Sequence, residues 1–220
     1  MRTQRQRPTS AGRRCAAGLP DSQAGRRAVF LDRDGTINRD QGHTHRIEDL
    51  ELLPGAAQAI HRLNEAGYRI IVVTNQSGIG RGLCAEADVE RFHAQLNVEL
   101  ARHAARIDAF YYCPHHPVEA RGEYRVACEC RKPGTALFRK AIRKLRIDVS
   151  RSYMIGDSPS DIEAGCRVGL TTIQLGDDIR RTAATGSNRP DFVAPDLLRA
   201  VRLIPGIRPA TQAPQRRRKL

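Results

Sequence analysis

The sequence predicts an α/β fold, a Rossmann-like three-layer sandwich built on a mainly parallel sheet. Three observations support this prediction. Short continuous apolar runs, at 28–31, 68–74 and 170–175 among others, are too short for helices and are typical of strands buried on both faces. Amphipathic helical segments alternate with these runs, as right-handed β-α-β crossovers require. Polar residues follow three of the runs, where open α/β sheets bind their ligands.

The first half of the chain contains two strands and two helices. The strand 28–31 leads into a Gly- and His-rich loop that reaches Leu53. Pro54 opens a helix to about Ala66, because Pro fits the first helical position, and Gly67 ends it. The strand 68–74 runs into 75–82, whose three glycines predict a loop that lets the backbone approach a ligand closely. Apolar residues on one face predict a helix from Ala85 to about Ala105.

The second half continues the alternation. A third strand is expected at 109–112, followed by an irregular loop over 113–132. The remaining expected elements are a helix at 135–145, a strand at 153–155, a helix at 160–168, a strand at 170–175 and a short helix at 196–203.

The net charge of +13 is concentrated at the two ends of the chain. Residues 1–27 carry +6 and residues 206–220 carry +5, which leaves +2 for 28–205. We therefore expect basic disordered tails at 1–26 and 205–220 around one domain at 27–204. A weak polyanion-binding role for the tails is the alternative. The near-neutral body argues against nucleic acid as a partner.

From the sequence we expect a cytoplasmic protein. No apolar run approaches the ~20 residues that span a bilayer, so no membrane contact is expected. The Arg-rich N-terminus lacks the apolar region of a signal peptide, so the six cysteines are not expected to form disulfides. We expect a monomer.

Chemically active side chains follow three of the predicted strands. Asp32 and Asp34 follow the first, Thr74 and Asn75 end the second, and Asp157 follows the fourth, with Asp161 one helical turn later. Arg131 and Lys132 precede a predicted helix. Carboxylates with open positions suit Mg²⁺, which also binds substrate phosphate. Thr74, Arg131 and Lys132 could hold phosphoryl oxygens.

These motifs resemble those of the haloacid dehalogenase superfamily of aspartyl-phosphate phosphatases. The matching pieces, in order, are Asp32-Arg33-Asp34-Gly35-Thr36, Thr74-Asn75, Lys132-Pro133 and Gly156-Asp157 with Asp161. The resemblance implies that Asp32 is the nucleophile and that Asp34 is the general acid and base. It implies Mg²⁺ bound by Asp32, the main-chain carbonyl of Asp34, and Asp157. Asp161 would either orient the site or only stabilise the first turn of its helix, where the helix dipole favours an acidic side chain.

Three cysteines and a histidine crowd into the loop after the third predicted strand. Cys113 and His115 form one short pair, and Cys128 and Cys130 form another. Two thiolate-containing pairs suit a tetrahedral zinc ion whose four places are all filled by the protein. We therefore expect a structural Zn²⁺ that holds together a loop without secondary structure of its own.

The zinc loop is similar to that of one branch of the superfamily, which contains heptose 1,7-bisphosphate 7-phosphatases and histidinol phosphatases. The resemblance covers about residues 27–204. It implies a small phosphorylated sugar as substrate, and it carries the substrate-binding role to Asp32, Arg33, Asp34, Asp40, Gln41, Gly42, His43, Thr74, Asn75, Gln76, Ser77, Arg131, Lys132 and Ser158. Two positions depart from the branch, since Ser158 replaces a common Lys and His43 replaces a more usual Tyr.

The leading prediction is a phosphomonoesterase that removes the 7-phosphate of a heptose bisphosphate. The alternatives are a histidinol-phosphate phosphatase, a nucleic-acid 3′-phosphatase, and an inactive relative that only binds. The loop 76–78 and the wide spacing between the two predicted pairs of metal ligands favour the heptose as substrate. The sequence has no stripe of aromatic residues that could stack on bases, which argues against nucleic acid. Neither 37–53 nor 79–131 has room for a separate domain, so we expect no cap domain.

Overall fold

A computed structural model of the chain describes residues 25–176 and 189–207. These residues form one six-stranded sheet in the order β3-β2-β1-β4-β5-β6, and every pair of neighbouring strands is parallel. The strands are β1 (Ala28–Leu31), β2 (Arg69–Asn75), β3 (Ala109–Cys113), β4 (Tyr153–Gly156), β5 (Thr171–Leu175) and β6 (Phe192–Ala194). The predicted α/β class with a parallel sheet is confirmed.

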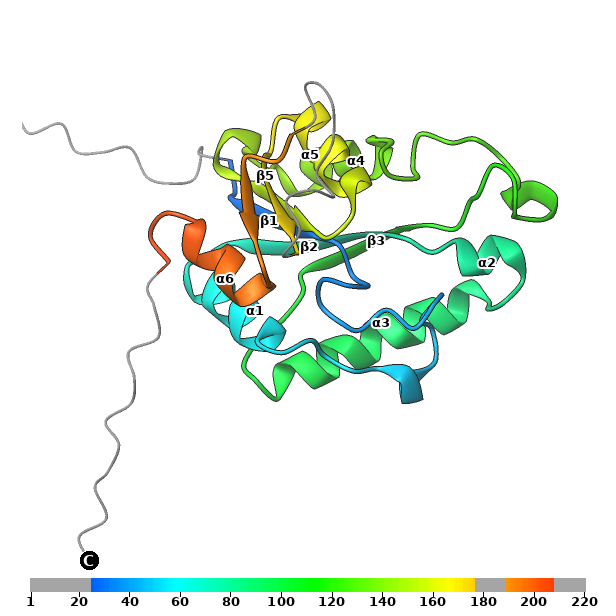
Figure 1. The fold of residues 1–220 in the computed structure, drawn as a ribbon, viewed down its shortest axis with the longest axis horizontal. Coiled ribbons are helices and arrows are strands. Elements are labelled where there is room, and N and C mark those ends of the chain that lie inside the picture. The colour runs from blue at the N-terminus through cyan, green and yellow to red at the C-terminus, as the bar shows by residue number, and fades with distance from the viewer. Residues whose placement is uncertain (1–24, 177–188, 208–220) are drawn as a thin grey trace, which may run out of the picture.

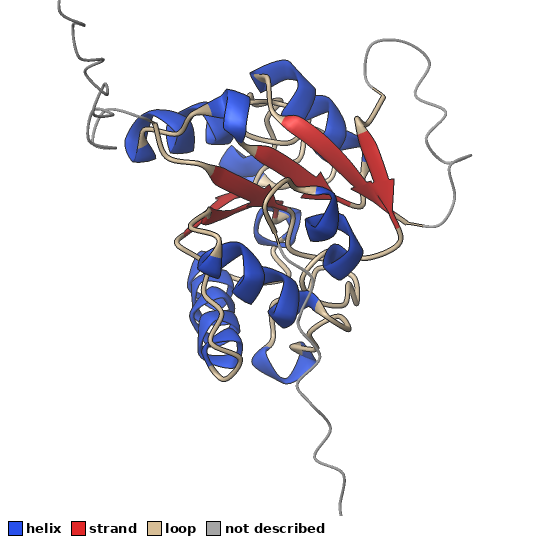
Figure 2. Cartoon of the chain, turned by 90° about the vertical axis from the view of Figure 1, so that its left-hand side faces the viewer, coloured by secondary structure: helices blue, strands red, loops and turns tan. Residues whose placement is uncertain are grey.

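Helices cover both faces of this sheet and form the outer two layers (Figures 1 and 2). The α-helices are α1 (Ala56–Glu65), α2 (Ser77–Arg81), α3 (Glu86–Ala101), α4 (Ala136–Leu145), α5 (Pro159–Val168) and α6 (Leu197–Ala200). Short 3₁₀ helices lie at Ile47–Asp49, Gly122–Tyr124, Val149–Arg151 and Val201–Leu203. In Figure 1, α4 and α5 lie on one side of the sheet and α1, α3 and α6 lie on the other.

Each face of the sheet buries its own apolar cluster. One cluster joins β1 and β2 to α1, α3 and α6 through residues such as Val29, Ile60 and Leu96. The other joins the opposite face to α4 and α5 through residues such as Phe30 and Phe138. Because side chains alternate between the two faces of a strand, Val29 and Phe30 enter different clusters. Burial on both faces fixes the strand positions, and hence the polar residues that follow them.

Several predicted boundaries are wrong. The first helix starts at Ala56 and not at Pro54, because Gly55 precedes it with a φ of 78°, a conformation that suits glycine. The segment predicted as a glycine-rich loop contains the helix α2, which packs Ile79 into the interior. The helix predicted to reach Ala105 ends at Ala101.

The C-terminal part also differs from prediction. The sequence analysis missed β6, a three-residue strand that pairs with β5 at the edge of the sheet. The helix expected at 196–203 is divided into α6 and a 3₁₀ turn. Residues 1–24 and 208–220, which include most of both predicted tails, lie outside the described residues.

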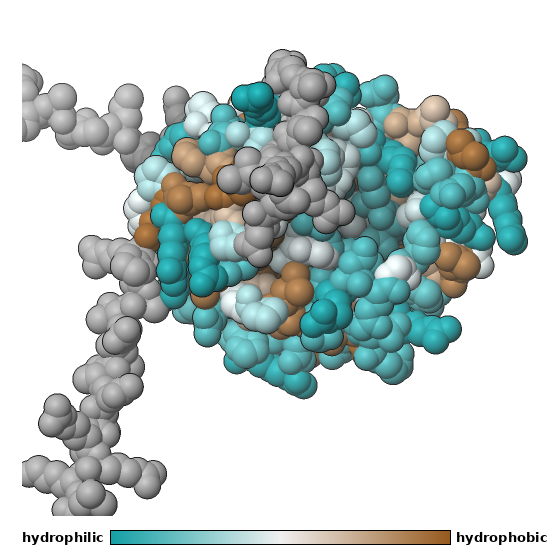
Figure 3. Space-filling view, viewed as in Figure 1, coloured by the Kyte–Doolittle hydropathy of each residue, from teal (hydrophilic) through white to brown (hydrophobic). Residues whose placement is uncertain are grey.

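Within the described ranges, no helix is long and apolar enough to cross a membrane. The face seen in Figure 3 is mainly hydrophilic, with apolar side chains in small separate patches. Exposed large apolar residues occur singly or in pairs along the described chain, for example at Leu83, Val98, and Phe192 with Val193. No second domain lies between the described elements.

Candidate active site

A pocket of about 330 Å³ opens where the carboxyl ends of β1, β2 and β4 meet. Its lining comes from the segments that follow these strands, together with Lys132 from the loop before α4. The lining residues are Asp32, Asp34, Asp40, Gly42, His43, Thr74, Asn75, Gln76, Ser77, Lys132, Asp157, Ser158 and Ser160. The pocket therefore collects residues that lie up to 128 positions apart in the sequence.

Asp32 presents its two carboxylate oxygens to different environments. Its Oδ1 accepts a hydrogen bond of 2.7 Å from the Arg33 backbone N–H and lies 2.7 Å from the Lys132 ammonium. Within the described residues, its Oδ2 has no hydrogen-bond donor. One oxygen is thus held in place by two donors, and the other is left for a reacting atom or a cation.

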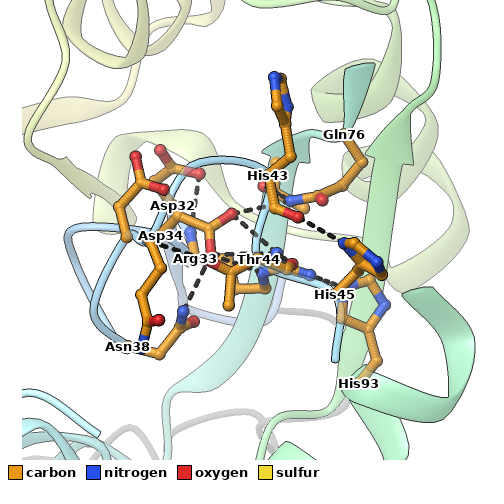
Figure 4. A network of polar contacts seen from close by, with 12 residues as sticks. Asp32, Arg33, Asp34, Asn38, His43, Thr44, His45, Gln76 and His93 are labelled. Atoms are coloured by element: carbon orange, nitrogen blue, oxygen red, sulfur yellow. Dashed lines mark hydrogen bonds and ion pairs between the residues drawn. The ribbon is translucent and has the colours of Figure 1, made fainter. Parts of the chain in front are cut away.

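Asp34 is held by the most extensive polar network of the site (Figure 4). Arg33 Nε and Nη2 reach it at 2.8–3.1 Å, Asn38 Nδ2 donates to Oδ1 at 2.9 Å, and Gln76 Nε2 donates to Oδ2 at 2.9 Å. Gln76 also donates to Thr74 Oγ1 at 2.9 Å. These donors fix the carboxylate in the orientation that a proton-transfer group requires.

The Arg33 side chain lies behind Asp34 and not in the pocket. It is fully buried, its guanidinium lies 4.5 Å from the centre of the Phe92 ring, and it also donates to the Thr44 carbonyl. Its Nη1 lies 3.3 Å from His93 Nε2. The Arg33 side chain therefore contacts Asp34 and does not line the pocket, and the substrate-binding role expected for Arg33 stays a prediction.

Lys132 lies between two carboxylates. Its Nζ is 2.7 Å from Asp32 and 2.6 Å from Asp161, and it also donates to the Val73 carbonyl at 2.8 Å. Asn75 holds the backbone of the same residue through its Oδ1 and Nδ2 atoms. Burial opposes the charge on Lys132, but the two carboxylates outweigh it and raise the pKa of the ammonium. The Asp161 side chain is fully buried, and burial raises its pKa.

Carboxylates on neighbouring strands form a group that suits a hard divalent cation. One oxygen each from Asp32, Asp157 and Asp161 lies within 4.8 Å of the others, although Lys132 already engages Asp161. Desolvation, followed by repulsion from Asp32, raises the pKa of Asp157 to about 6. Gly35 packs so closely that a Cβ there would lie 2.3 Å from Asp157 Oδ2. The crowded acids and this close packing fit Mg²⁺ held by Asp32 and Asp157.

Two more of the predicted substrate-binding residues lie outside the pocket lining. Arg131 Nη1 donates to the His115 carbonyl at 3.3 Å, so its guanidinium turns toward the metal-binding loop. The side chain of Gln41 donates to the Asp49 carbonyl. Ser160 lines the pocket and was missed, because its position at the start of α5 gave it only a helix-forming role in the sequence.

The predicted zinc ligands come together in the loop after β3. Cys113, His115, Cys128 and Cys130 each offer one ligand atom, and these atoms lie within 4.8 Å of one another. Five of the six sulfur–sulfur and sulfur–nitrogen distances among them are 3.0–3.6 Å. Burial, followed by the hydrogen bond with Cys130, raises the pKa of the Cys113 thiol. This donor set fits a soft divalent metal ion.

Comparisons with known proteins agree with this geometry. The sequence model of the HAD-hydrolase-like family matches residues 129–200. The D-glycero-β-D-manno-heptose-1,7-bisphosphate 7-phosphatase of Haemophilus ducreyi is 39% identical over 175 residues, which cover 79% of this chain and 96% of that protein. The phosphatase of the same name from Rhodopseudomonas palustris is 44% identical over 155 residues, covering 70% of this chain and 86% of that protein.

A solved structure is similar over the same region. The D,D-heptose 1,7-bisphosphate phosphatase of B. bronchiseptica, crystallised with magnesium and phosphate, superposes with a TM-score of 0.70 at 31% identity. The match covers 80% of this chain and 97% of that one. The chain therefore belongs to the D-glycero-β-D-manno-heptose-1,7-bisphosphate 7-phosphatase family of HAD-like phosphatases.

Proposed function

We propose that this protein removes the 7-phosphate of D-glycero-β-D-manno-heptose 1,7-bisphosphate through an aspartyl-phosphate on Asp32. The observation that carries the proposal is the arrangement around Asp32, with one oxygen held by two donors and the other free beside the fixed carboxylate of Asp34. Relatives that match nearly their whole length act on this heptose, which favours it over histidinol phosphate and over nucleic-acid ends.

Asp32 performs the first step. Its free Oδ2 attacks phosphorus in line with the bond to the C7 oxygen, and that bond breaks as the Asp32–phosphorus bond forms. Lys132 and the Arg33 backbone N–H hold Oδ1, so the carboxylate cannot rotate away. Thr74 lines the pocket beside them and offers a hydroxyl to the phosphoryl oxygens.

Asp34 handles the protons of both steps. It gives a proton to the leaving C7 oxygen and then removes one from the water that hydrolyses the aspartyl-phosphate. Asn38, Gln76 and the Arg33 guanidinium keep its carboxylate directed at the pocket through both steps.

Mg²⁺ would be held by Asp32, the main-chain carbonyl of Asp34 and Asp157, and it would neutralise the charge of the transferring phosphoryl group. Asp161 would act indirectly, because its contact with Lys132 keeps the ammonium between the two acids. Lys132 is the only Lys or Arg that lines the pocket in the described part of the chain. The sugar would therefore be bound largely through hydrogen bonds with residues such as Asp40, His43 and Ser158.

We also propose that Cys113, His115, Cys128 and Cys130 bind a structural Zn²⁺. Their loop leaves β3 and contains one 3₁₀ turn, which contacts α2 at the end of the molecule seen on the right of Figure 1. With four protein ligands the ion has no open position for substrate, so its contribution is to loop stability.

The test is phosphate release in the presence of Mg²⁺ from the β- and α-anomers of the bisphosphate, histidinol phosphate and a 3′-phosphorylated oligonucleotide. We expect kcat/KM for the β-anomer to exceed the others by ~100-fold, about 2.7 kcal/mol of transition-state discrimination. Asp32→Asn should abolish release, and circular dichroism should show that the variant is still folded. Equal rates on all four substrates would refute the assignment to the heptose, and an active Asp32→Asn would refute the nucleophile.

A further inference from the structure

A second pocket, of about 440 Å³, opens at the opposite edge of the sheet from the candidate active site. Five arginines line it: Arg26, Arg27, Arg69, Arg106 and Arg151. Arg27 directly precedes β1, Arg69 begins β2, and Arg151 lies two residues before β4. The pocket is therefore at the amino ends of the strands whose carboxyl ends carry the catalytic residues.

The positive charge in this pocket is only partly balanced. No acidic residue lines it within the described chain. Asp108, which lies beside it, contacts Arg69 at 2.7 Å and Arg106 at 3.7 Å. Within the same residues, the side chains of Arg26 and Arg151 make no hydrogen bond or ion pair. Among the residues that the structure describes, these two guanidinium groups therefore have no partner and offer their donors to a ligand.

Other contacts position the Arg27 guanidinium and the backbone of Arg106 before any ligand binds. Arg27 Nη2 donates to the Ala66 carbonyl at 2.9 Å, and its guanidinium lies 4.6 Å from the centre of the Tyr68 ring. The Asn64 side chain holds the backbone of Arg106 through two hydrogen bonds of 2.8 and 3.2 Å. Fixed donors lose little conformational entropy when an anion binds.

We propose that this pocket binds a small anion that carries at least two phosphate groups. Guanidinium groups match phosphate oxygens through paired hydrogen bonds, and five of them exceed what one phosphate can use. The volume falls in the ~300–1,000 Å³ range of small-molecule sites. Tyr68 is the only aromatic residue in the described lining, and Arg27 lies over its ring, so this ring is not free to stack on a nucleic-acid base. The proposal does not depend on the proposed function.

The experiment is calorimetric titration of the full-length chain with inorganic pyrophosphate, in buffer without Mg²⁺ so that binding at the active site is disfavoured. The test variant is Arg26→Gln/Arg151→Gln, whose two side chains are exposed and have no hydrogen bond or ion pair to any described residue. The control variant is Arg139→Gln/Lys140→Gln, which removes the same charge from two exposed residues of α4. Melting temperature and turnover are measured for all three proteins.

The test variant should lose pyrophosphate affinity by about 10-fold or more, the loss of at least one charge-assisted contact, while the control variant should bind as the parent does. Orthophosphate should bind more weakly than pyrophosphate. Equal weakening in both double variants would mean a general charge effect and would overturn the proposal. Citrate binding as tightly as pyrophosphate would overturn the assignment to phosphate groups.

Discussion

Arg33 offers the sharpest test of how the site is built. The fully buried guanidinium makes a two-pronged contact with Asp34 at 2.8–3.1 Å and lies over the Phe92 ring. Arg33→Met keeps a long apolar side chain but removes every one of these donors. If Arg33 positions Asp34, the substitution should reduce both stability and turnover, although the residue does not line the pocket.

The structure sets the size of the effect. Removing one partner of a buried ion pair costs ~3–5 kcal/mol. The Asp34 side chain is 18% exposed and can be partly rehydrated, so we expect the lower end, about 3 kcal/mol of unfolding free energy. In a chain of this size that corresponds to a fall of roughly 6–12 °C in melting temperature. Loss of the orientation of Asp34 should lower kcat by about 10- to 100-fold, part of the ~10²–10⁴ that general acid–base catalysis supplies.

The assay is thermal unfolding followed by circular dichroism, together with steady-state kinetics. Arg33→Lys should recover part of the stability but little of kcat, because an ammonium cannot make the two-pronged contact. Arg39→Met is the matched control, since Arg39 pairs with Glu51 on the surface and both side chains are 54% exposed. It should change neither quantity. An Arg33→Met variant with a kcat within twofold of the parent would refute the positioning role.

Three further predictions concern other parts of the structure. Cys128→Ser should remove one equivalent of bound zinc and lower the melting temperature, as should treatment of the parent with a chelator; unchanged zinc content measured by atomic absorption would contradict the metal site. Gly35→Ala should reduce kcat by at least about 10-fold, because the residue has a φ of 75° and the added Cβ would lie 2.3 Å from Asp157 Oδ2; a fully active variant would show that this packing is dispensable. His93→Gln should weaken the acid sensitivity of folding. Burial, followed by repulsion from Arg33, lowers the pKa of His93 to about 3, so below its unfolded pKa of ~6.5 the unfolded chain binds a proton that the folded chain does not. Between pH 6.5 and 3 this residue should therefore cost the parent ~1.4 kcal/mol of unfolding free energy for each unit by which the pH falls. If plots of unfolding free energy against pH are parallel for the parent and for His93→Gln, the prediction is disproved.

The polar residues at the ends of β1, β2 and β4 could be predicted from the sequence because each of these buried strands is a short apolar run. Once β1, β2 and β4 are placed in one parallel sheet, Asp32, Thr74 and Asp157 must meet at one edge. The metal-binding loop was equally predictable, since two closely spaced ligand pairs leave few alternatives. The helix α2 was not, because its glycines favour a loop locally and only the burial of Ile79 stabilises it.

By itself, the sequence determined the fold class, the family and the residue types at the catalytic edge, because these depend on apolar runs and on motif spacing along the chain. Only the tertiary structure decided where individual side chains point. Arg33 and Arg131 belong to the same sequence motifs as the residues that line the pocket. Arg33 is nevertheless buried against Phe92, and Arg131 donates to the His115 carbonyl. The arginine pocket likewise gathers residues from 26 to 151, which only the sheet brings together. The orientation of these side chains depends on packing against residues distant in sequence, so a local sequence pattern cannot predict it.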